Sequence, residues 1–230
     1  MTETKITQAL LKKRMEHAVD EKPLTFEKIL LKFDRLRSVL VYIKNLFNEV
    51  AKDGKLDHDG LQDAMKKLHV DMTLDEILDL FDFVNVQERD GGITIKEFLV
   101  ALTIGMVLDV IPALLSQSTN VVNTNSEISI GIDETFSGFL GHHGEIQELL
   151  SLIVTAYLIF DPKGKGYIER KGINETLVAH GNHGVHNNAM LSQERWAEMD
   201  WDGNGTIDFA EFVYSMMSWV DLTEDEDEEA

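Results

Sequence analysis

The sequence has no cysteine and only three prolines among its 230 residues. Without cysteine, the chain can form neither a disulfide nor a metal site built on thiolates. Its stability must therefore come from packing and from any metal that other side chains hold. A hydrophobic content of 43% excludes a disordered chain and is enough to bury a sizeable core, in one domain or in two small ones.

Basic residues are scarce, with 21 Lys and Arg against 41 Asp and Glu and a formal net charge of -20. This balance excludes general nucleic-acid binding, because the phosphates would be repelled. The charge is also unevenly spread. Residues 1 to 48 carry 10 basic and 6 acidic side chains, whereas the remainder carries 11 and 35. The acidic body can attract the basic head or a basic partner.

Long hydrophobic runs are absent as well. The most apolar stretch, Leu99 to Leu115, contains Asp109 and Pro112 and is shorter than the roughly 20 residues that span a bilayer. The first residues offer neither a signal peptide nor a glycine at position 2 for myristoylation. We therefore expect a cytoplasmic protein, with nuclear access left open and no membrane insertion.

One window, residues 200 to 211, carries oxygen-bearing side chains at regular intervals. Hard Ca²⁺ takes six to eight oxygens, and a 12-residue EF-hand loop supplies them from positions 1, 3, 5, 7, 9 and 12, with glycine at position 6. Gly205 stands at position 6, and the window therefore resembles an EF-hand loop and predicts calcium binding, with Mg²⁺ as a possible occupant at rest. The expected ligands are Asp200, Asp202, Asn204, Thr206 through its carbonyl, Asp208 and Glu211.

The same helix-loop-helix pattern recurs along the chain. The hydrophobic residue of position 8 is found at Leu56, Ile93, Ile168 and Ile207. This spacing predicts an all-α fold of four helix-loop-helix units in two pairs, with short β-bridges between paired loops and an extra N-terminal helix. The expected parts are a flexible segment (1–23), an N-terminal pair preceded by a basic amphipathic helix (24–115), a linker (116–144), a C-terminal pair (145–220) and an acidic tail (221–230).

The third loop, which begins at Asp161, keeps the length but not the chemistry. Lys163 and Lys165 occupy positions 3 and 5, and Gly172 replaces the glutamate of position 12. An ammonium group in the first coordination shell repels Ca²⁺. We expect no metal in this loop.

The two loops of the first half are degenerate too. Starting from Asn48 and Asn85, each needs an inserted residue to align with the pattern. The second retains Asp90 and Glu97 but contains Arg89. We expect both loops to serve packing, and the fourth loop to be the one intact site.

The residues around the fourth loop also resemble a known family. Trp196 to Gly205, followed by Phe209-x-Glu211-Phe212 and by Trp219-Val220 before an acidic tail, resembles the calmodulin-like calcium-binding proteins of plants. The segments 24–33 and 92–98 resemble the same branch. The resemblance implies a four-EF-hand calcium sensor, with the same six ligands in residues 200 to 211.

Two helical segments bear on partners. The basic amphipathic helix of residues 24 to 44 is either an extra helix packed on the N-terminal half or a ligand for the protein's own groove. Several apolar side chains of the C-terminal half either form the core or offer an adaptable groove to a basic amphipathic helix of a target protein. They are Met190, Met199, Phe212, Met216, Met217 and Trp219.

Signals for catalysis are weak. His180, His183 and His186 could hold zinc, but they lie among glycines and asparagines, as in a polar linker. The chain shows no nucleophile elbow, phosphate loop or kinase signature, so we expect no enzyme. Two functions remain open. The protein is a calcium sensor or adaptor, or it is a constitutive interaction subunit whose metal only stabilises the fold.

Overall fold

The computed structural model describes residues 3–17, 26–68, 70, 72–85, 91–110, 134–173 and 193–219. This part of the chain is mostly helical, with one small two-stranded sheet, which confirms the all-α class. The helices are α1 (Glu3–His17), α2 (Phe26–Arg35), α3 (Arg37–Val50), α4 (His58–Lys67), α5 (Leu74–Val84), α6 (Ile95–Val107), α8 (Glu134–Phe160), α10 (Gln193–Met199) and α11 (Phe209–Trp219); the strands are β1 (Ile168–Glu169) and β2 (Thr206–Ile207).

The hydrophobic residues of position 8 meet in two combinations. Strands β1 and β2 are antiparallel, with Ile168 opposite Ile207. Leu56 and Ile93 form an isolated bridge and exchange two backbone hydrogen bonds of 2.9 Å. All four side chains are buried. The first loop therefore contacts the second, and the third contacts the fourth.

Local side-chain chemistry fixes where several helices begin. Thr73 and Thr94 precede α5 and α6, and each forms a capping box with the glutamate three residues later. The backbone N–H of Thr94 donates to Glu97 Oε2 at 2.7 Å, for example. Asp57 caps α4 by accepting from the N–H of Gly60 at 2.7 Å. Each cap satisfies one of the free N–H groups of the first turn, and each capping box also satisfies the N–H of the cap residue.

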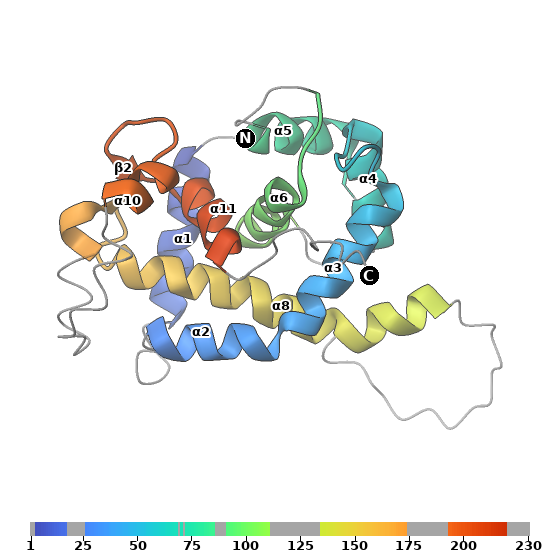
Figure 1. Ribbon diagram of the computed structural model, residues 1–230, viewed down its shortest axis with the longest axis horizontal. Coiled ribbons are helices and arrows are strands. Elements are labelled where there is room, and N and C mark those ends of the chain that lie inside the picture. Colours follow the sequence, from blue (N-terminus) through green and yellow to red (C-terminus); the bar gives the residue numbers. More distant parts are fainter. Residues whose placement is uncertain are drawn as a thin grey trace, which may run out of the picture.

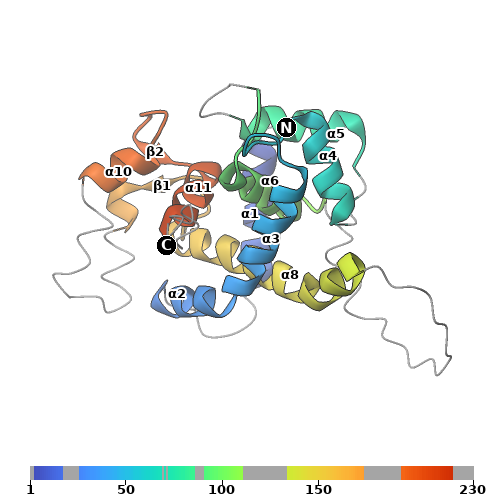
Figure 2. The ribbon, with the colours of Figure 1, turned by 45° about the vertical axis from the view of Figure 1, so that its right-hand side comes forward.

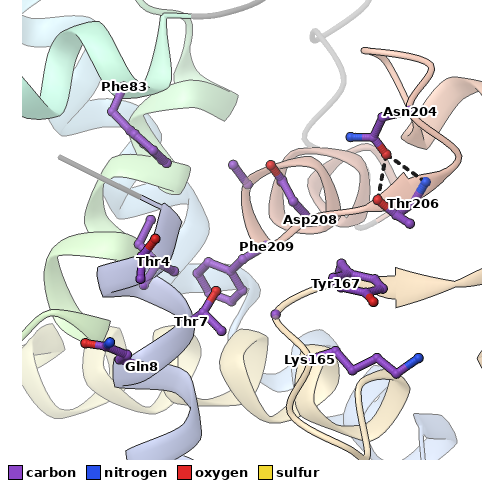
Figure 3. A pocket seen from close by; sticks show the side chains of 13 residues that line it. Thr4, Thr7, Gln8, Phe83, Lys165, Tyr167, Asn204, Thr206, Asp208 and Phe209 are labelled. Carbon is purple, nitrogen blue, oxygen red and sulfur yellow. Dashed lines mark hydrogen bonds between the residues drawn. The ribbon is translucent and has the colours of Figure 1, made fainter.

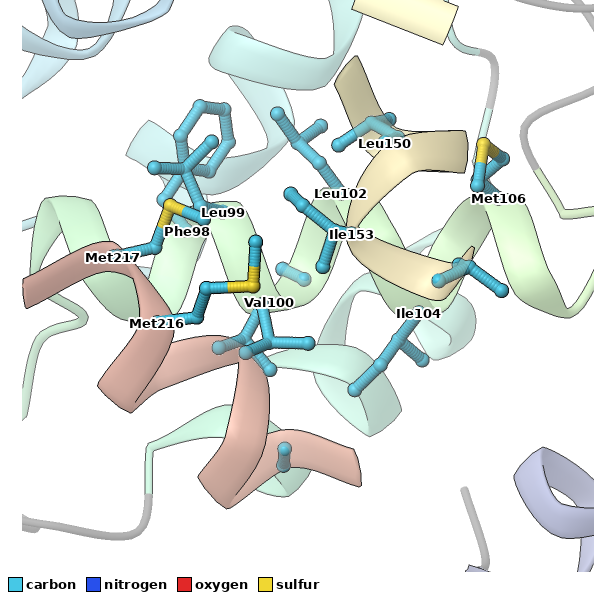
Figure 4. Close-up of a cluster of buried hydrophobic side chains, with 14 of the residues drawn as sticks. Phe98, Leu99, Val100, Leu102, Ile104, Met106, Leu150, Ile153, Met216 and Met217 are labelled. Carbon is cyan, nitrogen blue, oxygen red and sulfur yellow. The ribbon is translucent and has the colours of Figure 1, made fainter. Parts of the chain in front are cut away.

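Helix α6 lies at the centre of the molecule (Figure 1). Each of its residues from Glu97 to Val107 is buried. It packs against α11 on one side and against α8 on another. Figure 4 shows Met216 and Met217 of α11 beside Leu99 and Val100 of α6. One hydrophobic core therefore joins the first and the last parts of the chain.

Two expected boundaries are wrong. Residues 3–17 of the supposedly flexible segment form α1, whose Ile6 and Leu10 are buried in the core. Residues 134–144 of the supposed linker belong to the 27-residue helix α8. Helix α1 has no strongly one-sided apolar pattern, and residues 134–144 contain three glycines, so neither segment was predicted to be helical from sequence.

Helix α2 also lies elsewhere than expected. It packs on α8, the helix that leads into the third loop, as well as on α3, and it runs beside α8 in both views (Figures 1 and 2). Ile29 and Phe33 of α2 are buried in the core. Helix α2 is an extra packed helix, as one of the two alternatives held, but it rests on the C-terminal half as well.

No helix in the described ranges combines the length and the apolar character that crossing a membrane would require.

Candidate metal centre

Helices α10 and α11 bring three carboxylates of the fourth loop together. Asp200 directly follows α10, and Glu211 lies in the first turn of α11. One oxygen from each of Asp200, Asp202 and Glu211 lies within 4.8 Å of the other two. Three acids at such distances repel one another unless a cation or protons intervene.

The loop is wrapped by hydrogen bonds from its own backbone. The N–H of Gly205 donates to Asp200 Oδ2 at 3.0 Å, and the N–H of Asn204 donates to Asp202 Oδ1 at 2.9 Å. The N–H of Thr206 donates to Asn204 Oδ1 at 2.8 Å. Gly205 adopts a φ of 85°, in the left-handed region that favours glycine. The turn of position 6 thus has the residue that its geometry requires.

Asp208 and Glu211 fix the end of the loop to α11. The N–H of Asp208 donates to Glu211 Oε2 at 2.9 Å, and the N–H of Glu211 donates to Asp208 Oδ1 at 2.8 Å. This reciprocal pair is a capping box for α11. Asp208 therefore begins the helix as well as standing at a ligand position.

Two carboxylate oxygens of the loop are buried and lack a hydrogen-bond partner within the described residues. They are Asp200 Oδ1 and Glu211 Oε1. Leaving a buried acceptor unsatisfied costs about 1–3 kcal/mol. The first and the last ligand positions thus hold oxygens that a bound cation would satisfy, so the residues present fit a hard divalent ion.

The pKa of Glu211 also indicates that its charged carboxylate needs a cation nearby. Its side chain is 1% exposed. Burial, together with the charges of Asp208 and Asp202, raises the pKa of the Glu211 carboxyl from 4.5 to about 7. The charged form that a cation needs is therefore disfavoured until a cation arrives.

The third loop satisfies itself without a metal. Both oxygens of Asp161 accept backbone N–H groups, from Lys165 at 2.9 Å and from Gly166 at 2.8 Å. The Lys165 ammonium forms an ion pair with Glu169 at 2.8 Å, between positions 5 and 9. Asp161 and Asp200 occupy the same position of their loops, yet only Asp200 keeps a buried oxygen free of hydrogen bonds among the described residues.

The first loop differs from what the sequence led us to expect. Helix α3 extends to Val50, so Leu56 lies six residues after the helix end, whereas the corresponding distance is eight residues in the third and fourth loops. The loop is shortened, and the predicted insertion is wrong. Its acid Asp57 is used as a helix cap and in an ion pair with Lys52 at 2.9 Å.

In the second loop, Ile93 lies nine residues after the end of α5, which agrees with one inserted residue. Residues 86–90, including Arg89 and Asp90, lie outside the described part. Glu97 is engaged in the capping box of α6. The histidines 180–186 and the tail 221–230 also lie outside the described residues.

Sequence reasoning missed Tyr157, which lies beneath both C-terminal loops. Its side chain is fully buried and its hydroxyl has no hydrogen-bond partner among the described residues. Burial raises the pKa of the Tyr157 phenol, and the charges of Asp161, Asp208 and Glu211 raise it further. Its ring packs edge-on against Phe209, at a centroid distance of 5.0 Å. Its sequence pattern marked it only as one apolar position of a helix face.

Comparison with known proteins shows which proteins these loops resemble. The model of an EF-hand domain pair matches residues 52–105, which contain the first and second loops. This part of the chain is therefore similar to an EF-hand pair. The chain is 28% identical to the probable calcium-binding protein CML21 of Arabidopsis thaliana, over 88% of this chain and 78% of that protein. It is 24% identical to the probable calcium-binding protein CML22 of the same plant, over 89% and 81% of the two chains.

A human relative matches a shorter part. Calmodulin-like protein 6 of Homo sapiens is 35% identical over 34% of this chain and 44% of its own length. The predicted resemblance to calmodulin-like calcium-binding proteins is thereby confirmed.

The expected target groove is closed in this structure. Met199, Phe212, Met216 and Met217 are each at most 2% exposed. Met190 and the side chain of Trp219 lie outside the described residues. Among the side chains described, the methionines are part of the core, as the simpler of the two alternatives held.

Proposed function

We propose that this calmodulin-like protein binds one calcium ion in its fourth loop and has no catalytic role. The contrast between Asp200 and Asp161 carries the proposal. Asp161 is satisfied by its own loop, whereas Asp200 Oδ1 and Glu211 Oε1 are buried and lack partners among the described residues. The proposed ligands are Asp200, Asp202, Asn204, Thr206 through its carbonyl, Asp208 and Glu211. Mg²⁺ is the proposed occupant when calcium is low.

Four helix-loop-helix units in two pairs are the proposed frame for this site. The bridge between Leu56 and Ile93 and the strands β1 and β2 support that pairing. The pairs correspond to residues 24–115 and 145–220, followed by the acidic tail 221–230. In this frame the first three loops are scaffold.

The proposed response to calcium starts at Glu211. Because Glu211 lies in the first turn of α11, drawing its carboxylate toward a cation moves the start of that helix. Helix α11 packs on α6 through Met216 and Met217 (Figure 4). A shift of α11 relative to α6 would expose these side chains to a target protein, for which a basic amphipathic helix is the fitting ligand. The protein then acts as a calcium-responsive adaptor.

A constitutive subunit is the second candidate, and the same contact supports it. The apolar face of α11 is buried against α6, so opening requires separating a well-packed interface. A metal at about 100 times its dissociation constant would then stabilise the fold by roughly 2.7 kcal/mol without exposing a groove.

Calorimetry with three variants tests the site. Wild type is expected to bind one equivalent of Ca²⁺ and Glu211→Gln none, because the substitution removes the carboxylate that closes the coordination shell. Glu148→Gln is the matched control, since it makes the same change at an exposed position of α8 and should leave one equivalent bound. Binding by Glu211→Gln as strong as in wild type would remove the fourth loop from the proposal.

The two candidates are separated by an apolar dye added before and after calcium. An adaptor exposes the α6–α11 interface, so the dye signal rises with calcium in wild type and not in Glu211→Gln. A subunit binds calcium in the calorimeter while the dye signal stays constant.

A further inference from the structure

Helix α1 packs directly on the third loop. Gly164 and Gly166 of that loop have φ values of 64° and 86°, and a Cβ added to either would overlap a side chain of α1. The side chain that meets Gly164 is Leu11, and the one that meets Gly166 is Thr7. Because the two glycines lack side chains, the helix approaches the loop backbone as closely as its own side chains allow.

The rest of α1 holds those two side chains in place. Ile6 and Leu10, one residue before each, are 4% and 3% exposed and point into the core. At the other end of the helix, the ammonium group of Lys13 pairs with Asp109 at 3.3 Å, just beyond α6. Helix α1 thus presents one face to the core and a neighbouring face, with Thr7 and Leu11, to the third loop.

The third loop connects this contact to the candidate calcium site. Gly166 lies two residues before Ile168, which pairs with Ile207, and Glu169 pairs with Thr206. Thr206 stands at position 7 of the fourth loop, where the backbone carbonyl is a ligand. A continuous path therefore leads from Thr7 through β1 and β2 to a ligand position.

Helix α1 also faces the fourth loop across a cavity of about 370 Å³. Thr4, Thr7 and Gln8 line it on the side of α1, and Asn204, Thr206 and Asp208 line it on the other (Figure 3). Half of the six proposed ligand residues thus border a space that α1 helps to enclose. A helix that left this position would alter the surroundings of the site as well as the partner loop.

We propose that Thr7 and Leu11 are positioning residues for calcium binding. Through these two side chains, α1 packs on the third loop and stabilises the loop conformation that a second bound cation would otherwise stabilise. A loop without metal has only its own hydrogen bonds and its neighbours to hold it in the shape that β1 needs. Helix α1 supplies the missing neighbour. This inference rests on the proposed calcium site in the fourth loop.

The proposal has a reciprocal consequence. If docked α1 strengthens calcium binding by some factor, calcium strengthens the docking of α1 by the same factor. Couplings of this kind are commonly about 5- to 150-fold in affinity. We expect the lower part of that range, since α1 contacts the ligands through β1 and β2 rather than directly.

The test is the double variant Thr7→Ala with Leu11→Ala, which removes both contacts. The two substitutions leave the charge of α1 unchanged and do not lower its helix propensity. Its Ca²⁺ dissociation constant is expected to rise roughly 5- to 20-fold. Met15→Ala is the control, because Met15 lies on the same helix and is 74% exposed; its affinity should match that of wild type. Leu11→Met alone, which keeps an apolar side chain over Gly164, should stay within about twofold of wild type.

Hydrogen exchange of the α1 amides gives the second readout. In wild type, calcium should slow exchange in α1, and in the double variant α1 should exchange faster, with a smaller effect of calcium. Unchanged affinity in the double variant, or unchanged protection of its α1, overturns the proposal. If wild type bound no calcium, the proposed function itself would be wrong. If wild type and the double variant bound calcium with the same affinity, only the role of Thr7 and Leu11 would be refuted.

Discussion

Raising the pH from 5 to 8 in the presence of a chelator is expected to destabilise the wild-type protein more than Glu211→Gln. The folded protein raises the pKa of the Glu211 carboxyl from 4.5 to about 7, chiefly by burial. The metal-free folded state therefore holds this proton more tightly than the unfolded chain does. The resulting contribution to stability is complete below pH 4.5 and is lost as the pH rises through about 7.

The magnitude follows from the shift. One pKa unit corresponds to about 1.4 kcal/mol, so the full contribution of Glu211, for a shift from 4.5 to about 7, is about 3.5 kcal/mol. Part of it is already lost at pH 5, because an ordinary glutamate is mostly ionised there. Between pH 5 and pH 8, the free energy of unfolding of wild type should fall by about 2.5 kcal/mol more than that of Glu211→Gln.

Urea unfolding at a series of pH values measures this difference, since Glu211→Gln keeps all the other titrating groups. Saturating calcium should abolish it in wild type, because a bound cation favours the charged carboxylate. Parallel pH profiles of the two proteins in chelator would refute the argument that burial holds a proton on Glu211. A difference that persisted in calcium would instead show that no cation reaches this carboxylate.

Two further outcomes are expected. Tyr157→Phe should raise the free energy of unfolding by about 1 kcal/mol, because the tyrosine hydroxyl is buried and has no hydrogen-bond partner among the described residues; thermal unfolding in chelator checks this, and a clear loss of stability would contradict it. The triple variant Lys163→Asp, Lys165→Asn and Gly172→Glu should bind two equivalents of Ca²⁺ in the calorimeter. The glutamate has room, since an added Cβ at position 172 meets no atom closer than 3.9 Å. A folded variant that still binds one equivalent would show that the lysine charges alone do not prevent the third loop from binding calcium.

The fourth loop could be predicted from sequence as a candidate calcium site because its side chains are close together in the chain. All the proposed ligands lie within residues 200–211, and the spacing of oxygen-bearing residues follows from how one loop would wrap one ion. The capping boxes of Thr73 and Thr94 are equally local, because each partner glutamate lies three residues away. The hydrophobic residue of position 8 in each loop was recognisable for the same reason.

The boundaries that failed depend on distant contacts. Helix α1 has few apolar side chains, and the burial of Ile6 and Leu10 becomes favourable only where α6 and α8 meet it. The shortened first loop escaped notice because helical periodicity alone does not tell where α3 ends. Met216 and Met217 have the same sequence pattern in an open groove and in a closed core.

By itself, the sequence determined the chemistry of this protein: one loop with a complete set of hard oxygen donors, another loop with lysines at the corresponding positions, and the hydrophobic residues that could join the two. Only the tertiary structure decided how those parts are used. It buried Asp200 Oδ1 and Glu211 Oε1 without partners among the described residues, closed the α6–α11 interface, and placed α1 on Gly164 and Gly166. Ligand spacing is a property of twelve consecutive residues, whereas burial and close approach arise when segments far apart in the chain compete for the same core.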